Sequence, residues 1–206
     1  MEQAIVSHRG SGARPPGALR SRAALRARAS GITLIELLVT MTVVVILLSI
    51  GVPSFRYVTN ANRIAGEVNG LLGDLQFARA EAVKEGQTVT VCRSSTGKSC
   101  QDLISWEKGW IVFADANGDH TVDAGETILR IQAPFASSDT FRADNGVSYV
   151  TFNREGFANF PAGVTTTSTL TLHDSTSNSV WTRCLAVTLI GQMSTQTSGQ
   201  AGTNCL

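Results

Sequence analysis

The sequence predicts an α+β domain in which one long N-terminal helix, apolar at first and amphipathic later, packs on an antiparallel β-sheet. Three observations lead to this prediction. Residues 32–52 are nearly all apolar, residues 53–86 carry apolar side chains at helical spacing, and the chain from residue 87 onward alternates short apolar runs with turn residues. A helix with one apolar stripe buries that stripe against the sheet that follows it.

The first 31 residues differ in charge from the rest of the chain. They hold six of the 17 basic and one of the 16 acidic side chains, which leaves 11 basic and 15 acidic ones for residues 32–206. This mildly acidic body disfavours generic nucleic-acid binding, because such binding depends on neutralising phosphates. Basic residues before an apolar segment predict an N-terminus that stays in the cytoplasm.

The apolar segment 32–52 contains a single charged side chain, Glu36. As a helix rising about 1.5 Å per residue it spans roughly 30 Å, the thickness of a bilayer core. We therefore predict a single-pass membrane helix, with residues 87–206 forming a β-rich periplasmic domain. A plain signal anchor is the alternative, but it does not account for Glu36, since a carboxylate in the bilayer costs at least about 2.5–3.5 kcal/mol.

Residues 53–86 are predicted to continue as an amphipathic helix that ends near Glu85, with Gly86 just after it. Its apolar stripe consists of Ala61, Ile64, Ala65, Val68, Leu71, Leu72, Leu75, Ala78 and Ala82. Short alternating runs then predict strands at 88–92, 110–114, 127–131, 147–152, 169–173 and 184–190. The sequence NREG at 153–156 predicts a turn in which the glycine takes a positive φ.

Gly31 and the sequence ITLIELLVTMTVVVILLSIGVPSF after it resemble the N-terminal region of type IV prepilins and type II secretion pseudopilins. The resemblance implies that a prepilin peptidase removes the basic leader 1–31 by cutting between Gly31 and Ile32, and that Ile32 is then N-methylated. Cutting would create an ammonium group near Glu36 or beside a neighbouring copy. Because opposite charges stabilise each other strongly at low dielectric, we expect Glu36 to mark the register in which assembled helices pack.

Later segments resemble the GspH/FimT-type minor pilins and pseudopilins. The matching segments are LLGDLQFARAEAVKEG, VTVCRSS, WEKGWIVFADANGD, DAGETILR, TFNREGFA and CLAVTLIGQ. The resemblance implies a minor subunit of a type II secretion pseudopilus or a type IV pilus, with a role in protein secretion or pilus biogenesis. Its implied partners are other pilins or pseudopilins, met through the N-terminal helix, the prepilin peptidase and the inner-membrane assembly platform.

The four cysteines lie at 92, 100, 184 and 205, without a CxxC pair, and the three histidines are scattered, which argues against a zinc site. Two disulfides are expected if the domain lies outside the cytoplasm. Of the three possible pairings we favour Cys92 with Cys100 and Cys184 with Cys205, because each closes a short loop rich in small polar residues. Reduced, buried thiols remain the alternative.

Residues 115–126 read DANGDHTVDAGE and offer oxygen ligands at the spacing of a calcium-binding EF-hand loop. The candidate ligands are Asp115, Asn117, Asp119, Thr121, Asp123 and Glu126. His120 stands where such a loop requires glycine, and strands rather than helices are predicted on both sides. We therefore favour a metal-free hairpin loop that satisfies its own backbone, with calcium as the alternative and no other cofactor.

We predict that the protein is not an enzyme. Ser94 and Ser95 lack a G-x-S-x-G setting, and His173 and Asp174, adjacent on a predicted strand, point to opposite faces.

DNA binding is the alternative function, since some minor pilins of this group bind DNA through a glycine followed by arginines after the last strand. Here Gly191 is followed by Gln192, and no charged side chain occurs after Arg183, so nucleic acid is an improbable partner. Arg142 and Arg154 are the other basic residues that could form a patch with Arg183.

Overall fold

The computed structural model describes residues 31–102, 105–164, 166–198 and 205. The chain divides into two compact units, Met1–Ile46 and Leu47–Leu206. Helix α1 (Leu34–Glu85) contributes to both, and all the strands belong to the second unit. Apart from Gly31, the predicted leader lies outside the described residues.

The second half of α1 buries the stripe that the sequence predicts. Its buried positions recur every three or four residues and are Ile64, Val68, Leu71, Leu75, Ala78 and Ala82. The helix contains Pro53 within its length, and it ends at Glu85, where the sequence predicts its end. Gly86 follows with a φ of 67°, and its N–H donates to the carbonyl of Ala82 at 3.0 Å, which is the left-handed glycine cap that closes many helices.

The first sheet has five strands in the order β3-β2-β1-β5-β6, and every pairing is antiparallel. Its strands are β1 (Val89–Arg93), β2 (Trp110–Ala114), β3 (Ile128–Gln132), β5 (Tyr149–Phe152) and β6 (Ala158–Asn159). In the central strand β1, Val91 lies opposite Val112 of β2 and Val150 of β5. All three valines are fully buried, so this row forms part of the core.

The second sheet has four antiparallel strands in the order β4-β7-β8-β9. Its strands are β4 (Thr140–Ala143), β7 (Thr167–His173), β8 (Arg183–Thr188) and β9 (Met193–Thr197). Two short 3-10 helices, η1 (Trp106–Lys108) and η2 (Asp144–Gly146), lie in the connections. Leu170 of β7 lies opposite Leu185 of β8, and both are fully buried.

The prediction of a single sheet is therefore wrong, since the strands form two sheets. Strands β4, β6 and β9 were also not predicted, because each is short or, like β9, lacks the alternation of large apolar residues that marks a strand. The α+β class and the order of helix before strands are confirmed.

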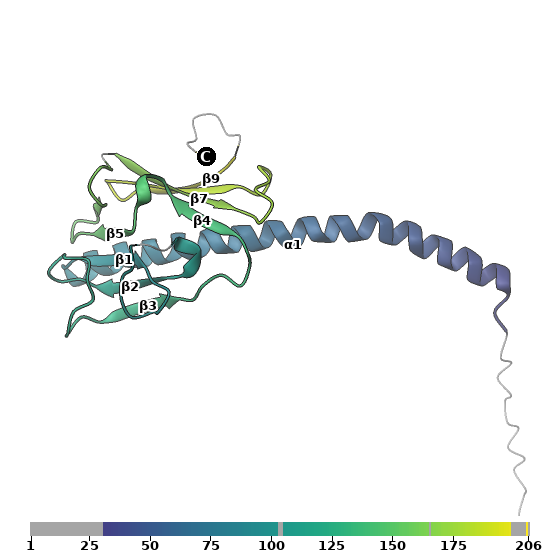
Figure 1. Ribbon diagram of the computed structural model, residues 1–206, viewed down its shortest axis with the longest axis horizontal. Helices are drawn as coiled ribbons and strands as arrows, with labels where there is room; N and C mark the ends of the chain where they lie inside the picture. The colour runs from purple at the N-terminus through teal and green to yellow at the C-terminus, as the bar shows by residue number, and fades with distance from the viewer. Residues whose placement is uncertain (1–30, 103–104, 165, 199–204, 206) are drawn as a thin grey trace, which may run out of the picture. The chain divides into compact units, whose positions relative to one another are not determined.

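One apolar core joins the stripe of α1 to both sheets, and Figure 1 shows this part of the helix running alongside them. Two of the tryptophans in the core, Trp106 and Trp110, have hydrogen-bonded indole groups. The indole N–H of Trp106 donates to the carbonyl of Val147 at 3.0 Å, and that of Trp110 donates to the carboxylate of Asp74 on α1 at 2.8 Å. Arg130 of β3 also binds Asp74, at 2.9 Å, so helix and first sheet are joined by polar as well as apolar contacts.

Candidate functional site

Glu36 lies in the first turn of α1, where Thr33 caps the helix. The Thr33 side-chain oxygen accepts a hydrogen bond from the N–H of Glu36 at 3.2 Å, and its carbonyl accepts one from the N–H of Leu37 at 3.1 Å. The sequence T-x-x-E is the pattern of a capping box, and an acid at this end interacts favourably with the helix dipole. The Glu36 side chain is exposed, and within the described part of the chain it has no ion-pair partner.

The apolar part of α1 is exposed along its length. The helix contains an 18-residue window with a mean hydropathy of 2.5, and none of that window is buried. Large apolar side chains between Ile32 and Val52 are 45% to 82% exposed. By length and composition this helix can cross a membrane, and its uncovered apolar surface is far larger than a soluble monomer normally presents.

The structure joins the cysteines in the two pairs that the sequence favoured. Cys92 and Cys100 have Cα atoms 5.5 Å apart, and Cys184 and Cys205 have Cα atoms 5.6 Å apart. The first disulfide ties the end of β1 to the loop after it, and the second ties β8 to a residue close to the C-terminal end.

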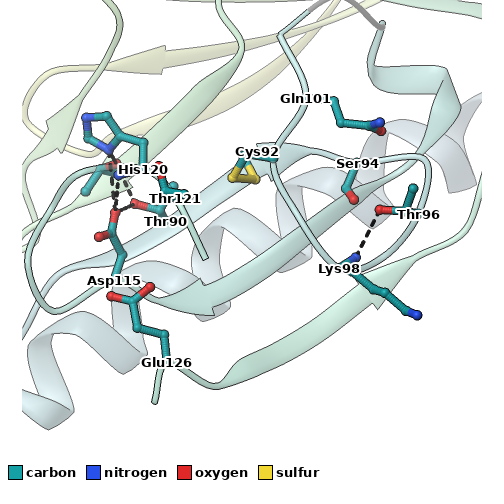
Figure 2. The surroundings of a disulfide bond; sticks show 12 residues. Thr90, Cys92, Ser94, Thr96, Lys98, Gln101, Asp115, His120, Thr121 and Glu126 are labelled. Atoms are coloured by element: carbon teal, nitrogen blue, oxygen red, sulfur yellow. Dashed lines mark hydrogen bonds and ion pairs between the residues drawn. A yellow bond between two sulfur atoms is a disulfide. The ribbon is translucent and has the colours of Figure 1, made fainter. Parts of the chain in front are cut away.

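Asp115, the first of the predicted calcium ligands, is completely buried and serves the backbone of its own loop. One carboxylate oxygen accepts the N–H of Gly118 at 2.8 Å. The other accepts the hydroxyl of Thr90 at 2.6 Å and the N–H of His120 at 3.2 Å (Figure 2). His120 takes a positive φ of 65°, at the position where an EF-hand loop requires glycine. Its ring stacks on Tyr149 with the ring centres 3.8 Å apart.

The other predicted ligands also bond within the loop. Asn117 donates to the carboxylates of Asp119 and Asp123 at 3.0 and 3.1 Å, and Asp119 accepts the N–H of Thr121 at 2.8 Å. Glu126 accepts two backbone N–H groups of the loop. Over the described residues, no group of three or more His, Cys, Asp or Glu side chains is arranged to hold a metal. These bonds make a hairpin loop whose polar side chains satisfy its own backbone.

The residues considered for catalysis have structural partners. The Ser94 hydroxyl accepts the N–H of Gly97 at 3.0 Å, and His173 Nδ1 lies 3.1 Å from the hydroxyl of Thr182. Asp174 is buried and accepts hydrogen bonds from residues of the loop between β7 and β8. These contacts organise the loop after β1 and the loop between β7 and β8.

The three arginines considered for DNA binding do not form one patch. Arg142 of β4 lies opposite Thr171 of β7, whereas Arg183 of β8 lies opposite Leu172, the next residue of β7. Because successive residues of a strand face opposite sides of a sheet, the two arginines point to opposite faces. Arg154 lies on the turn between β5 and β6, where it pairs with its neighbour Glu155 at 2.8 Å.

An acidic pair between α1 and the segment before β4 was not predicted. Arg63 donates to both oxygens of Asp139, at 2.8 and 3.1 Å, and Asp139 is only 2% exposed. One turn along α1, Glu67 accepts the hydroxyl of Ser137 at 3.0 Å, while its second carboxylate oxygen is buried and has no hydrogen-bond partner in the described structure. Burial raises the pKa of Glu67 from 4.5 to about 7, and the nearby charge of Asp139 adds to the rise.

The free energy of unfolding is expected to fall as the pH rises from about 4.5 to about 7. The folded state holds the Glu67 proton up to about pH 7, whereas the unfolded chain releases it near 4.5, so the stabilisation present below pH 4.5 is lost by about pH 7. The unfolding temperature of the wild type should therefore decrease between pH 4.5 and 8 relative to that of Glu67→Gln. Glu85→Gln, at an exposed acid of the same helix, should follow the wild type. Parallel curves for wild type and Glu67→Gln would contradict this expectation.

Comparison with known proteins was made on sequence and on structure. The family model of the type II transport protein GspH matches residues 67–191, more than half of the chain, and that of the prokaryotic N-terminal methylation motif matches residues 26–52. Two crystal structures of the type IV minor pilin FimU from Pseudomonas aeruginosa (strain PAO1) also align with the chain. One is 20% identical with a TM-score of 0.48, covering 69% of this chain and 99% of FimU, and the other is 21% identical with a TM-score of 0.49, covering 74% and 99%. The comparison with curated proteins gives no match.

An exposed apolar helix that continues into the core of a two-sheet domain defines a pilin-like filament subunit. Within that class, the chain belongs to the family of the type II transport protein GspH. It is a minor pilin or pseudopilin with a structural role, and the DNA-binding alternative is not supported.

Proposed function

We propose that the chain is made as an inner-membrane prepilin, is cut between Gly31 and Ile32, and assembles through its apolar helix into a type II secretion pseudopilus or a type IV pilus. The observation that carries the proposal is the exposed apolar helix whose first turn holds one acid, Glu36, beneath the Thr33 cap. The methylation-motif match at residues 26–52 supports processing at this place.

The charge on Glu36 has a physical role in this scheme. Cutting after Gly31 turns the amide nitrogen of Ile32 into an amine, which keeps its positive charge when it is methylated. In the low dielectric of a lipid bilayer or a helical filament core, an unpaired carboxylate and an unpaired ammonium are both costly, whereas the pair is stabilising when well placed. Lipid covers the apolar helix before assembly, and the helices of neighbouring subunits cover it afterwards.

The proposed topology and partners follow from the same segment. The arginines before residue 32 hold the N-terminus in the cytoplasm, and the disulfide-bonded domain lies in the periplasm. The partners are other pilins or pseudopilins, the prepilin peptidase and the inner-membrane assembly platform. The subunit works without catalysis, and the loop 115–126 folds without metal.

Processing tests this proposal. Co-expression with a prepilin peptidase should shorten the chain by residues 1–31, and mass spectrometry should find Ile32 as the first, methylated residue. Gly31→Ala should abolish the cut. Gly51→Ala is the matched control, because an added methyl group at residue 51 also meets no atom within 4 Å, and it should be processed normally. A full-length product with the peptidase present would refute the proposal.

A further inference from the structure

Aromatic and apolar side chains gather where α1 meets the loop between β7 and β8. The ring of Tyr57 on the helix lies 4.6 Å from that of Trp181 on the loop, measured between ring centres. Next to these two residues in the chain, Val58 and Val180 are, like Tyr57, each more than half exposed, whereas Trp181 is only 9% exposed. These four residues, here called the interfacial patch, expose the side chains of Tyr57, Val58 and Val180 to solvent, while the ring of Trp181 packs against Tyr57 and is itself buried.

The interfacial patch lies just beyond the apolar segment. Tyr57 is five helical positions after Val52, the last residue of that segment, which corresponds to about 7–8 Å of helix rise. The headgroup layer on each side of a bilayer core is roughly 5–8 Å thick. Tyrosine and tryptophan concentrate in this layer, because their rings are apolar and their edges are polar. A helix that spans the core with residues 32–52 therefore carries Tyr57 into the headgroup layer.

The loop that carries Trp181 is suited to such an environment, because its backbone bonds to itself. The N–H groups of Ser177, Asn178, Val180, Trp181 and Thr182 all donate to groups within the loop. Polar backbone groups that are already paired can enter a less polar layer at little cost. The one acid of the loop, Asp174, is buried and hydrogen-bonded.

Two arginines, Arg56 and Arg183, lie next to the interfacial patch. Arg183 donates to the carbonyls of Val180 and Thr182, both at 3.0 Å, and so stands beside the tip of the loop. Arg56 lies on α1 between Phe55 and Tyr57 and is exposed. Arginines next to exposed aromatic residues match the surface of a membrane that contains anionic phospholipid.

We propose that the interfacial patch docks on the headgroup layer of a bilayer containing anionic phospholipid, and so holds the folded domain against the membrane until the subunit is assembled. The inference rests on the membrane anchorage given as the proposed function. It adds a second membrane contact, made by the domain itself through a loop far from the anchor in sequence.

The full-length protein in vesicles of phosphatidylethanolamine and phosphatidylglycerol tests the docking. A free cysteine introduced by Ser179→Cys, next to the interfacial patch, carries an environment-sensitive fluorophore. The matched control is Glu155→Cys on the turn between β5 and β6, because Arg79, which bonds to that turn, lies about 33 Å of helix rise beyond Tyr57. We expect the label at 179 to emit at shorter wavelength and to be quenched by a lipid with a nitroxide headgroup, and the label at 155 to show neither effect.

Further variants and outcomes separate the two proposals. Val180→Ser should reduce the lipid quenching at 179, whereas Val83→Ser, at an equally exposed valine outside the patch, should not. The label at 179 could remain exposed to water while the chain still resists alkaline extraction from the membrane. That result would overturn the docking proposal and leave the proposed membrane anchorage intact. A blue shift without lipid quenching that grows with protein density means that a second copy covers the patch, and also overturns the docking proposal. A chain that fails to float with the vesicles overturns both.

Discussion

Glu36→Gln is expected to leave cleavage after Gly31 intact and to lower incorporation of the subunit into filaments on the order of 100-fold. The change keeps the shape of the side chain and removes only its charge. It leaves the amine of Ile32 without a partner among packed apolar helices, and removing one member of a buried ion pair costs about 3–5 kcal/mol. Since about 1.4 kcal/mol corresponds to a factor of ten, the loss is large enough to measure by immunoblotting sheared filaments or pseudopili.

Two controls make the Glu36 experiment decisive. Glu85→Gln neutralises another acid of α1, one that lies at the C-terminal end of the helix and pairs only with Lys84 in the described structure, and it should incorporate normally. The amount of mature protein in the membrane must match the wild type, since glutamine enters lipid more readily than glutamate. Wild-type incorporation of Glu36→Gln would show that the carboxylate has no role in assembly.

Asp115→Ala is expected to lower the free energy of unfolding by about 3 kcal/mol, because it removes a fully buried carboxylate that accepts hydrogen bonds from three donors. Those donors are the hydroxyl of Thr90 and the N–H groups of Gly118 and His120. For a chain of this size the change should reduce the unfolding temperature by about 6–12 °C. Thermal unfolding followed by tryptophan fluorescence measures it, because Trp106 and Trp110 are buried in the core.

Asp123→Ala provides the comparison within the same loop. Asp123 is exposed, and among the residues that the structure describes its side chain accepts a hydrogen bond only from Asn117, so the loss should be below about 1 kcal/mol. Both effects should be independent of calcium. A calcium site would instead raise the unfolding temperature of the wild type as calcium is added, and that rise would disappear in both variants. Equal losses for Asp115→Ala and Asp123→Ala would contradict the buried network.

The helix was the most predictable part of the fold. Its stripe repeats over six turns, and Gly86 supplies a stop that is local in sequence, so neither feature depends on distant contacts. The strands rich in β-branched and aromatic residues were predicted correctly because this composition is also a local signal in the sequence. Strand β9 could not be, because its polar sequence MSTQT forms a strand only by pairing with β8 at the edge of the second sheet.

The residues of the candidate site also fall into two groups: those that a local sequence pattern reveals and those that come together only in the folded chain. Glu36 and the spacing of the loop 115–126 are visible in the sequence. The T-x-x-E pattern that begins at Thr33 is visible too, although the sequence analysis did not assign Thr33 its capping role. The acidic pair of Glu67 and Asp139 is not visible, because the two residues meet only when the segment before β4 packs on α1. The contact of Tyr57 with Trp181 likewise depends on the path of the loop between β7 and β8.

The pairing of Glu36 with a newly formed amine is the central claim, and covalent trapping tests it directly. A membrane-permeant carbodiimide joins a carboxylate to an amine only when the two are in contact. Applied to membranes that contain the mature subunit together with its partner pilins, it should give an amide between Glu36 and an Ile32 amine, or the N-terminal amine of a partner. Mass spectrometry would identify this peptide, which Glu36→Gln should abolish. Recovery of a free Ile32 amine and an unlinked Glu36 from assembled material would contradict the claim.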